Sequence, residues 1–141
     1  MKLADIEKEI QLDSVIDNAD LDRESLRIPI LHAKYYHFFM DELKILKGLE
    51  REFRMTKLDR ILYYTGKAPD EVYLESPLDL KVLKNEVDIY LDADPKLSQL
   101  RMNCEFQQAK VSMLEGFTKL IANRSFIIKN ALDFQRFKNG A

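Results

Sequence analysis

Apolar residues recur every three or four positions along most of the chain, which is the periodicity of amphipathic helices. Near the N-terminus, Leu3, Ile6 and Ile10 follow this spacing and predict a short helix over about 2–12. The whole sequence holds four glycines and four prolines, which leaves little material for the turns of a multi-stranded sheet. Pattern and composition together predict an all-α fold of long helices joined by short loops.

The longest apolar stripe runs from Leu26 to Ile61 and predicts one helix over roughly 20–64. Pro29 lies inside this helix, and we expect a bend there because proline removes a backbone donor and clashes with the preceding turn. Gly66 follows the last periodic residue, and a glycine at this place commonly ends a helix.

Two helix-start signals divide the second half of the chain. The only convincing internal loop covers residues 65–75. The Ser-Pro pair at 76–77 combines an N-cap with a proline at the first helical position, and it predicts a helix over about 77–92. The Asp-Pro pair at 94–95 repeats this signal and predicts another helix from about 95 to 120.

The last segment, RSFIIKNALDFQRF over 124–137, has an apolar face wider than one neighbouring helix needs. In a small chain, such excess apolar surface is typical of subunit association. We therefore expect an oligomerisation segment over about 115–138. It lies within a single helical domain of 1–141, with N-terminal helices in 1–66 and C-terminal helices in 76–141. The candidate oligomerisation residues are Phe117, Leu120, Ile121, Phe126, Ile127, Ile128, Leu132 and Phe137.

The net charge of −2 hides alternating acidic and basic blocks. Residues 44–67 contain seven Lys or Arg against three Asp or Glu, whereas residues 70–94 contain two against eight. This alternation suits a partner for an anionic polymer that also contacts proteins or other copies of itself.

The basic block forms a stripe along the predicted long helix, because its cations are three or four residues apart. The stripe ends in TKLDRILYYTGK (56–67), where a tyrosine pair lies beside further cations. Proteins that bind single-stranded nucleic acid without sequence preference combine a cationic track with aromatic faces. A solvated helix face with ordinary ion pairs explains the same residues, and both interpretations stay open here. The candidate DNA-binding residues are Lys47, Arg51, Arg54, Lys57, Arg60, Tyr63, Tyr64 and Lys67.

No constellation of catalytic or metal-binding residues stands out. His32 and His37 are five residues apart, so they do not share a helix face as an i, i+4 metal pair would. Cys104 has no His or Cys nearby, and we interpret it as a small core residue. Residues 65–67 lack the second glycine of a phosphate-cradling loop. We expect no enzyme activity, no metal and no cofactor.

The stretch 57–66 resembles a central motif of the UvsY family, the recombination mediators of T-even-type phages, which is approximately L-K-A-R-L-x-Y-Y-x-G. Arg60, the tyrosine pair and Gly66 match in register, whereas Lys57 stands one position before the family lysine and Asp59 adds an acidic charge. The C-terminal pattern of the family is similar to a second set of residues here. That set is Ile121, Arg124, Phe126, Ile128, Lys129, Asp133 and Phe137. The opening residues 1–6 also resemble the family's start.

The resemblance implies a ring-like homo-oligomer of six or seven subunits that binds single-stranded DNA. It implies two protein partners, a RecA-like phage recombinase and the phage single-strand-binding protein. The mediator is expected to help the recombinase displace the single-strand-binding protein. The expected location is the cytoplasm of the infected bacterial host, in agreement with a lone cysteine and no stretch that resembles a signal peptide or a membrane span.

Two other interpretations compete. A helical scaffold or adaptor could oligomerise without binding DNA, so that the basic stripe is incidental. The C-terminal segment could instead be a basic amphipathic helix on a membrane surface, although Asp133 is mixed with its cations.

Overall fold

The computed structural model describes residues 1–140, which form six helices and no strand, so the predicted all-α class is confirmed. The helices are α1 (Leu3–Ser14), α2 (Leu21–Tyr64), α3 (Asp70–Glu75), α4 (Val87–Ala93), α5 (Pro95–Ala122) and α6 (Arg124–Lys138). The chain divides into two compact units. The first unit combines Met1–Lys44 with the residues from Ala109 onward, and the second is Ile45–Gln108. Both α2 and α5 therefore contribute residues to each unit.

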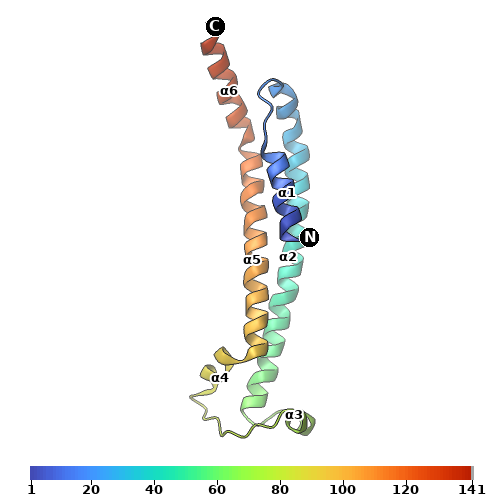
Figure 1. Cartoon of the computed structure of the whole chain (residues 1–141), viewed down its shortest axis with the longest axis vertical. Coiled ribbons are helices and arrows are strands. Elements are labelled where there is room, and N and C mark those ends of the chain that lie inside the picture. The colour runs from blue at the N-terminus through green and yellow to red at the C-terminus, as the bar shows by residue number, and fades with distance from the viewer. Residues whose placement is uncertain (141) are drawn as a thin grey trace. The chain divides into compact units, whose positions relative to one another are not determined.

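In the first unit, α1 lies along α2 and α5 (Figure 1). One apolar side chain of α1 and several of α2 and α5 are buried between these helices, and burying a side chain of this kind contributes about 1.5–3 kcal/mol. The ring of Tyr35 packs edge-on against that of Phe117, with 4.5 Å between the ring centres. The buried core residues are Ile6, Leu31, Tyr35, Leu114, Phe117 and Ile121.

Polar contacts around Asp13 hold the end of α1 within the first unit. Its Oδ2 accepts hydrogen bonds from Lys34 Nζ and from the Tyr35 hydroxyl, each at 2.7 Å. Its backbone carbonyl accepts a hydrogen bond from Arg124 Nη2, at the start of α6. Arg124 is only 4% exposed, so this arginine stabilises the fold and does not present its charge to solvent.

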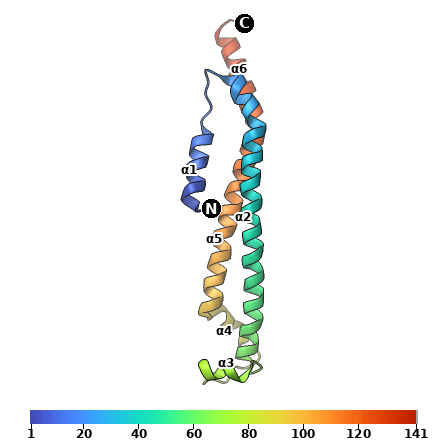
Figure 2. The same cartoon turned by 90° about the vertical axis from the view of Figure 1, so that its right-hand side faces the viewer.

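The second unit is built from the C-terminal part of α2, from α3 and α4, and from the first turns of α5 (Figure 2). Helix α2 ends at Tyr64 and is followed by Gly66, whose φ of 76° lies in the left-handed region. The N–H of Gly66 donates to Tyr63 O at 3.3 Å and that of Lys67 to Leu62 O at 2.8 Å. These two bonds form the Schellman motif that a C-terminal glycine permits.

The helices predicted over 2–12 and 20–64, and from 95 onward, are confirmed. The helix predicted over 77–92 is wrong: α3 occupies part of the expected loop, and α4 begins only at Val87. The reason is a tertiary contact, because the Tyr63 hydroxyl donates to Ser76 O at 3.0 Å. Ser76 ends α3 with φ −135° and ψ 82° and does not cap a helix that follows it.

Within residues 1–140, no helix has the length and apolar character needed to cross a membrane.

Candidate nucleic-acid interface

Four exposed cations lie along α2 in the second unit: Lys47, Arg51, Arg54 and Lys57, called here the cationic track. Lys47 Nζ lies 3.2 Å from Glu50 Oε2, a solvent-exposed pair of the kind that contributes little to stability. Among the described residues, none forms a hydrogen bond or ion pair with the side chains of Arg51, Arg54 or Lys57. These three charges are therefore available to an anionic ligand.

Arg60 occupies a different environment from the cationic track. Its Nε donates to Asp94 Oδ2 at 2.6 Å, and its Nη2 lies 3.4 Å from the Tyr64 hydroxyl. The guanidinium lies over the ring of Tyr63, 4.2 Å from the ring centre. The side chain is 16% exposed, and its charge is compensated within the chain.

Asp94 joins the end of α2 to the start of α5. Its Oδ2 accepts one hydrogen bond from Arg60 and another, at 2.7 Å, from the Tyr64 hydroxyl. Its Oδ1 caps α5, because it accepts hydrogen bonds from the backbone N–H groups of Lys96 and Leu97 at 3.0 and 3.1 Å. Burial alone would raise the pKa of Asp94, but the hydrogen bonds from Tyr64, Leu97 and Arg60 hold that pKa below its ordinary value. Arg60, Tyr64 and Asp94 are called here the Asp94 cluster.

The tyrosine pair faces inward. Tyr63 is 7% exposed, and its ring stacks on that of Tyr73 with 5.4 Å between the centres and 18° between the planes. The Tyr73 hydroxyl donates to Tyr63 O at 2.8 Å. Tyr64 lies 5.6 Å from Tyr90, ring centre to ring centre. The ring of Tyr63 thus has no face left to stack on a nucleobase. The rings packed against Tyr63 and Tyr64 explain why both residues are aromatic.

The predicted DNA-binding residues therefore separate into two groups. The cationic track and Lys67 are exposed, whereas Arg60, Tyr63 and Tyr64 make intramolecular contacts. The sequence does not indicate Asp94 as their partner, because the Asp-Pro pair at 94–95 predicts only the start of a helix.

The candidate oligomerisation residues also separate by burial. Phe117, Ile121 and Ile128 are 7%, 0% and 4% exposed and pack inside the first unit. On α6 an exposed apolar surface remains. It includes Phe134, which is 64% exposed but is not among the predicted oligomerisation residues. The exposed apolar residues of α6 are Phe126, Ile127, Leu132, Phe134 and Phe137.

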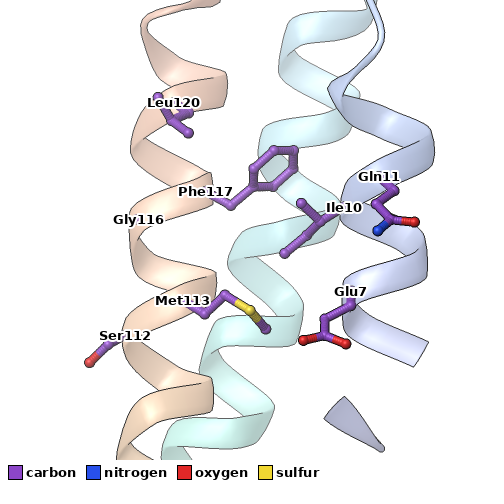
Figure 3. Close-up of a pocket in the computed structure, with 8 residues that line it drawn as sticks. All are labelled: Glu7, Ile10, Gln11, Ser112, Met113, Gly116, Phe117 and Leu120. Atoms are coloured by element: carbon purple, nitrogen blue, oxygen red, sulfur yellow. The ribbon is translucent and has the colours of Figure 1, made fainter. Parts of the chain in front are cut away.

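A concave surface between α1 and α5 in the first unit encloses a volume of about 600 Å³. Figure 3 shows Ile10 from α1 and Met113 and Phe117 from α5 extending into it. Its one charged lining residue is Glu7. This surface is apolar and carries no cation, so it does not suit a nucleic-acid backbone.

The described part of the chain contains no group of three or more His, Cys, Asp or Glu side chains that could hold a metal ion. Cys104 is half-buried, and burial together with Glu50, Glu52 and Glu105 raises the pKa of its thiol. A thiol with a raised pKa is less nucleophilic at neutral pH.

The family described as "Recombination, repair and ssDNA binding protein UvsY" matches residues 9–141. Two crystal structures of the bacteriophage T4 recombination mediator protein UvsY are similar in fold. One, in lattice type II, has a TM-score of 0.86 and 22% identity over 99% of this chain and 98% of that chain. The other, in lattice type IV, has a TM-score of 0.82 and 21% identity over 98% of this chain and 99% of that chain.

A comparison with curated proteins found no match. At 21–22% identity the structural likeness shows the shared fold, and the family match over nearly the whole chain shows the membership. The chain belongs to the UvsY family of recombination, repair and single-stranded-DNA-binding proteins.

Proposed function

We propose that this chain is a recombination mediator that binds single-stranded DNA and promotes loading of a RecA-like recombinase onto DNA covered by single-strand-binding protein. The family supplies the class of function, and one observation supports the DNA-binding part. Arg51, Arg54 and Lys57 present three exposed charges that have no partner within residues 1–140, along one helix in a chain whose net charge is −2.

Phosphate contacts from such a track carry no sequence information and depend on salt. Each contact with a single strand releases counterions and adds about −0.7 to the slope of log K against log salt concentration. Three or four contacts from one subunit give a slope of about −2 to −3, so counterion release contributes only a small part of the affinity for each subunit. Binding by one subunit is therefore modest.

The Asp94 cluster has a supporting role in this proposal. It holds the end of α2 against the start of α5, and Lys57 lies one turn before Arg60 on α2. Removing Arg60 would weaken DNA binding through loss of local structure. Tyr63 acts in the same way, as a packed ring against Tyr73.

Self-association through α6 completes the proposal. Phe126, Phe134 and Phe137 are 67%, 64% and 80% exposed, and large rings are rarely left in water on a helix without a partner. A ring of six or seven subunits places many weak cationic tracks on one strand at high effective concentration. Binding by the assembly then exceeds what one track can supply.

The mediator acts by assembly and breaks no covalent bond, so it requires no active site, metal or cofactor. Its partners in this proposal are single-stranded DNA, the recombinase and the single-strand-binding protein, in the cytoplasm of the infected bacterial host. The exposed face of α6 equally suits an oligomeric scaffold that binds no DNA, and DNA binding distinguishes the two.

The test is titration of a fluorescent oligo-dT at several salt concentrations, with the mass of the protein measured by light scattering. We expect binding that weakens steeply as salt rises, by an assembly of several subunits. Salt-independent binding, or no binding at low salt, would leave the scaffold as the function of this chain. A filament-loading assay with recombinase on protein-covered DNA then tests mediation itself.

A further inference from the structure

Gly116 lies in the interior of α5, although no contact within the chain requires a glycine there. A glycine inside a helix destabilises it relative to alanine, because the glycine backbone loses more conformational entropy on folding. Unlike Gly66, Gly116 does not adopt a positive φ. A Cβ added to it would meet no atom within 4 Å, so no neighbouring element approaches too closely for a side chain.

The missing side chain enlarges the concave surface between α1 and α5 in the first unit, called here the α1–α5 groove. Figure 3 shows Gly116 in the wall that α5 contributes, between Met113 and Leu120. Leu120, a predicted oligomerisation residue, also lines the groove and is 59% exposed. A groove of about 600 Å³ with apolar walls is large enough to receive side chains from another molecule. An occupant of this kind would explain the glycine.

The charge of the groove indicates which chemistry the occupant has. Glu7 is its one charged lining residue, and within residues 1–140 the Glu7 carboxylate forms no ion pair or hydrogen bond. An apolar segment that also carries cations would therefore fit both the walls and the charge of the groove.

The exposed surface of α6 has this chemistry. The side chains of Phe126, Phe134 and Phe137 are 67%, 64% and 80% exposed. Three exposed cations of α6 form no ion pair within the described part of the chain, and a single acidic residue, Asp133, accompanies them. These cations are Lys129, Arg136 and Lys138.

We infer that the exposed rings of α6 from one subunit occupy the α1–α5 groove of a second copy, where Glu7 faces the α6 cations. The inference rests on the self-association that the proposed function assigns to α6, and it names the surface that receives α6. Because the two surfaces differ, the contact is head-to-tail, and each subunit still offers one surface to the next copy. A two-fold contact of α6 with α6 would use the same surface twice and would not explain Gly116.

Filling the groove tests the contact without changing α6. Gly116→Leu places a large side chain in the groove and replaces a poor helix former by a good one. We expect its helical circular dichroism to equal that of wild type, and its mass by light scattering to fall toward that of a single subunit. Gly48→Leu makes the same change in the second unit, where an added Cβ also has no neighbour within 4 Å, and should keep the wild-type mass.

Cross-linking identifies the two surfaces directly. In a Cys104→Ser background, Gln11→Cys places a thiol on the α1 side of the groove. Asn130→Cys places one on the ring face of α6, four residues after Phe126 and four before Phe134. With a short bismaleimide, we expect the double variant to form covalent dimers and longer oligomers. Each single variant should remain monomeric on a denaturing gel.

The outcomes separate this inference from the proposed function. Dimers from Asn130→Cys alone, or only monomers from the double variant while the wild type is assembled, would overturn the groove contact and leave DNA binding intact. A Gly116→Leu variant as large as wild type would overturn it as well. Wild-type protein that assembles but binds no oligo-dT would remove the proposed function and leave the contact in place.

Discussion

Arg60 and Asp94 form an ion pair with 2.6 Å between Nε and Oδ2, although they are 34 positions apart in the sequence. The Tyr64 hydroxyl donates to the same oxygen at 2.7 Å, and the other Asp94 oxygen caps α5. The stretch 57–66, which resembles the family motif, therefore contains two of the three residues of the Asp94 cluster. It shares only Lys57 with the cationic track.

Arg60→Gln should lower the free energy of unfolding by about 2–4 kcal/mol, because it leaves the Asp94 carboxylate buried without its charged partner. The salt slope of DNA binding measured under folding conditions should stay close to wild type. Arg51→Gln is the matched control, since its exposed side chain has no partner among the described residues. It should change stability by less than about 0.5 kcal/mol and make the salt slope shallower. Urea unfolding and DNA titration together give both values.

The protein should lose stability in acid. Burial alone would raise the pKa of Asp13 and of Asp94. Hydrogen bonds from Lys34 and Tyr35 instead hold the pKa of Asp13 below its ordinary value. Hydrogen bonds from Tyr64, Leu97 and Arg60 do the same for the pKa of Asp94. A carboxyl whose pKa is lower in the folded state stabilises the fold above its unfolded-state pKa of about 3.9. That stability is lost as the pH falls below about 5 and through the folded-state pKa.

Asp94→Asn tests this assignment. The amide still caps α5 but has no charge to lose, so its free energy of unfolding should vary less steeply below about pH 5 than that of wild type. Urea unfolding at a series of pH values measures the difference. Equal steepness in the two proteins would mean that Asp94 is not an important source of the acid sensitivity.

Two exposed glycines of the second unit should respond in opposite directions to the same substitution. Gly48 lies inside α2 with no atom within 4 Å of an added methyl group, so Gly48→Ala should stabilise by about 0.5–1 kcal/mol. Gly66 has equal space but a φ of 76°, so Gly66→Ala should destabilise by about 1–2 kcal/mol. Thermal unfolding of the two variants separates the effect of backbone conformation from that of packing. A Gly66→Ala variant more stable than wild type would contradict the Schellman motif after α2.

The exposed rings of α6 should control assembly. The double variant Phe126→Ser with Phe134→Ser should form smaller assemblies than wild type at the same concentration, because it removes two exposed apolar side chains from the proposed subunit contact. Leu74→Ser with Leu80→Ser is the control, since these side chains are 81% and 61% exposed in the second unit. Light scattering gives the masses, and a double phenylalanine variant as large as wild type would place the subunit contact elsewhere.

The long helices could be predicted because their signals are local. Apolar spacing, Gly66 and the Asp-Pro pair at 94–95 each act within one or two turns, and α2 and α5 begin or end where these signals stand. The helix predicted from Ser76 failed for the opposite reason. A hydroxyl from Tyr63, 13 residues earlier, binds its carbonyl, and a cap signal carries no information about such a contact.

The sequence predicts which residues form the candidate site, but it does not predict which of their side chains face solvent. The exposed members of the cationic track follow from helical spacing alone. The sequence also predicts Arg60, Tyr63 and Tyr64 as DNA-binding residues, because cationic and aromatic side chains bind single-stranded nucleic acid. Their partners Asp94, Tyr73 and Ser76 come from other elements, so only the folded chain reveals that these side chains contact one another.

The most direct test of DNA binding by the cationic track removes its unpaired charges without changing the fold. The triple variant Arg51→Gln, Arg54→Gln and Lys57→Gln is compared with Lys8→Gln, Lys81→Gln and Lys84→Gln, which removes the same number of exposed charges elsewhere. The measurement is the slope of log K against log salt for oligo-dT. We expect a slope shallower by about 2 for each subunit engaged in the track variant, and a slope near wild type in the control. Equal slopes in the two variants would contradict DNA binding by the cationic track, because the affinity would then follow net charge and not the track on α2.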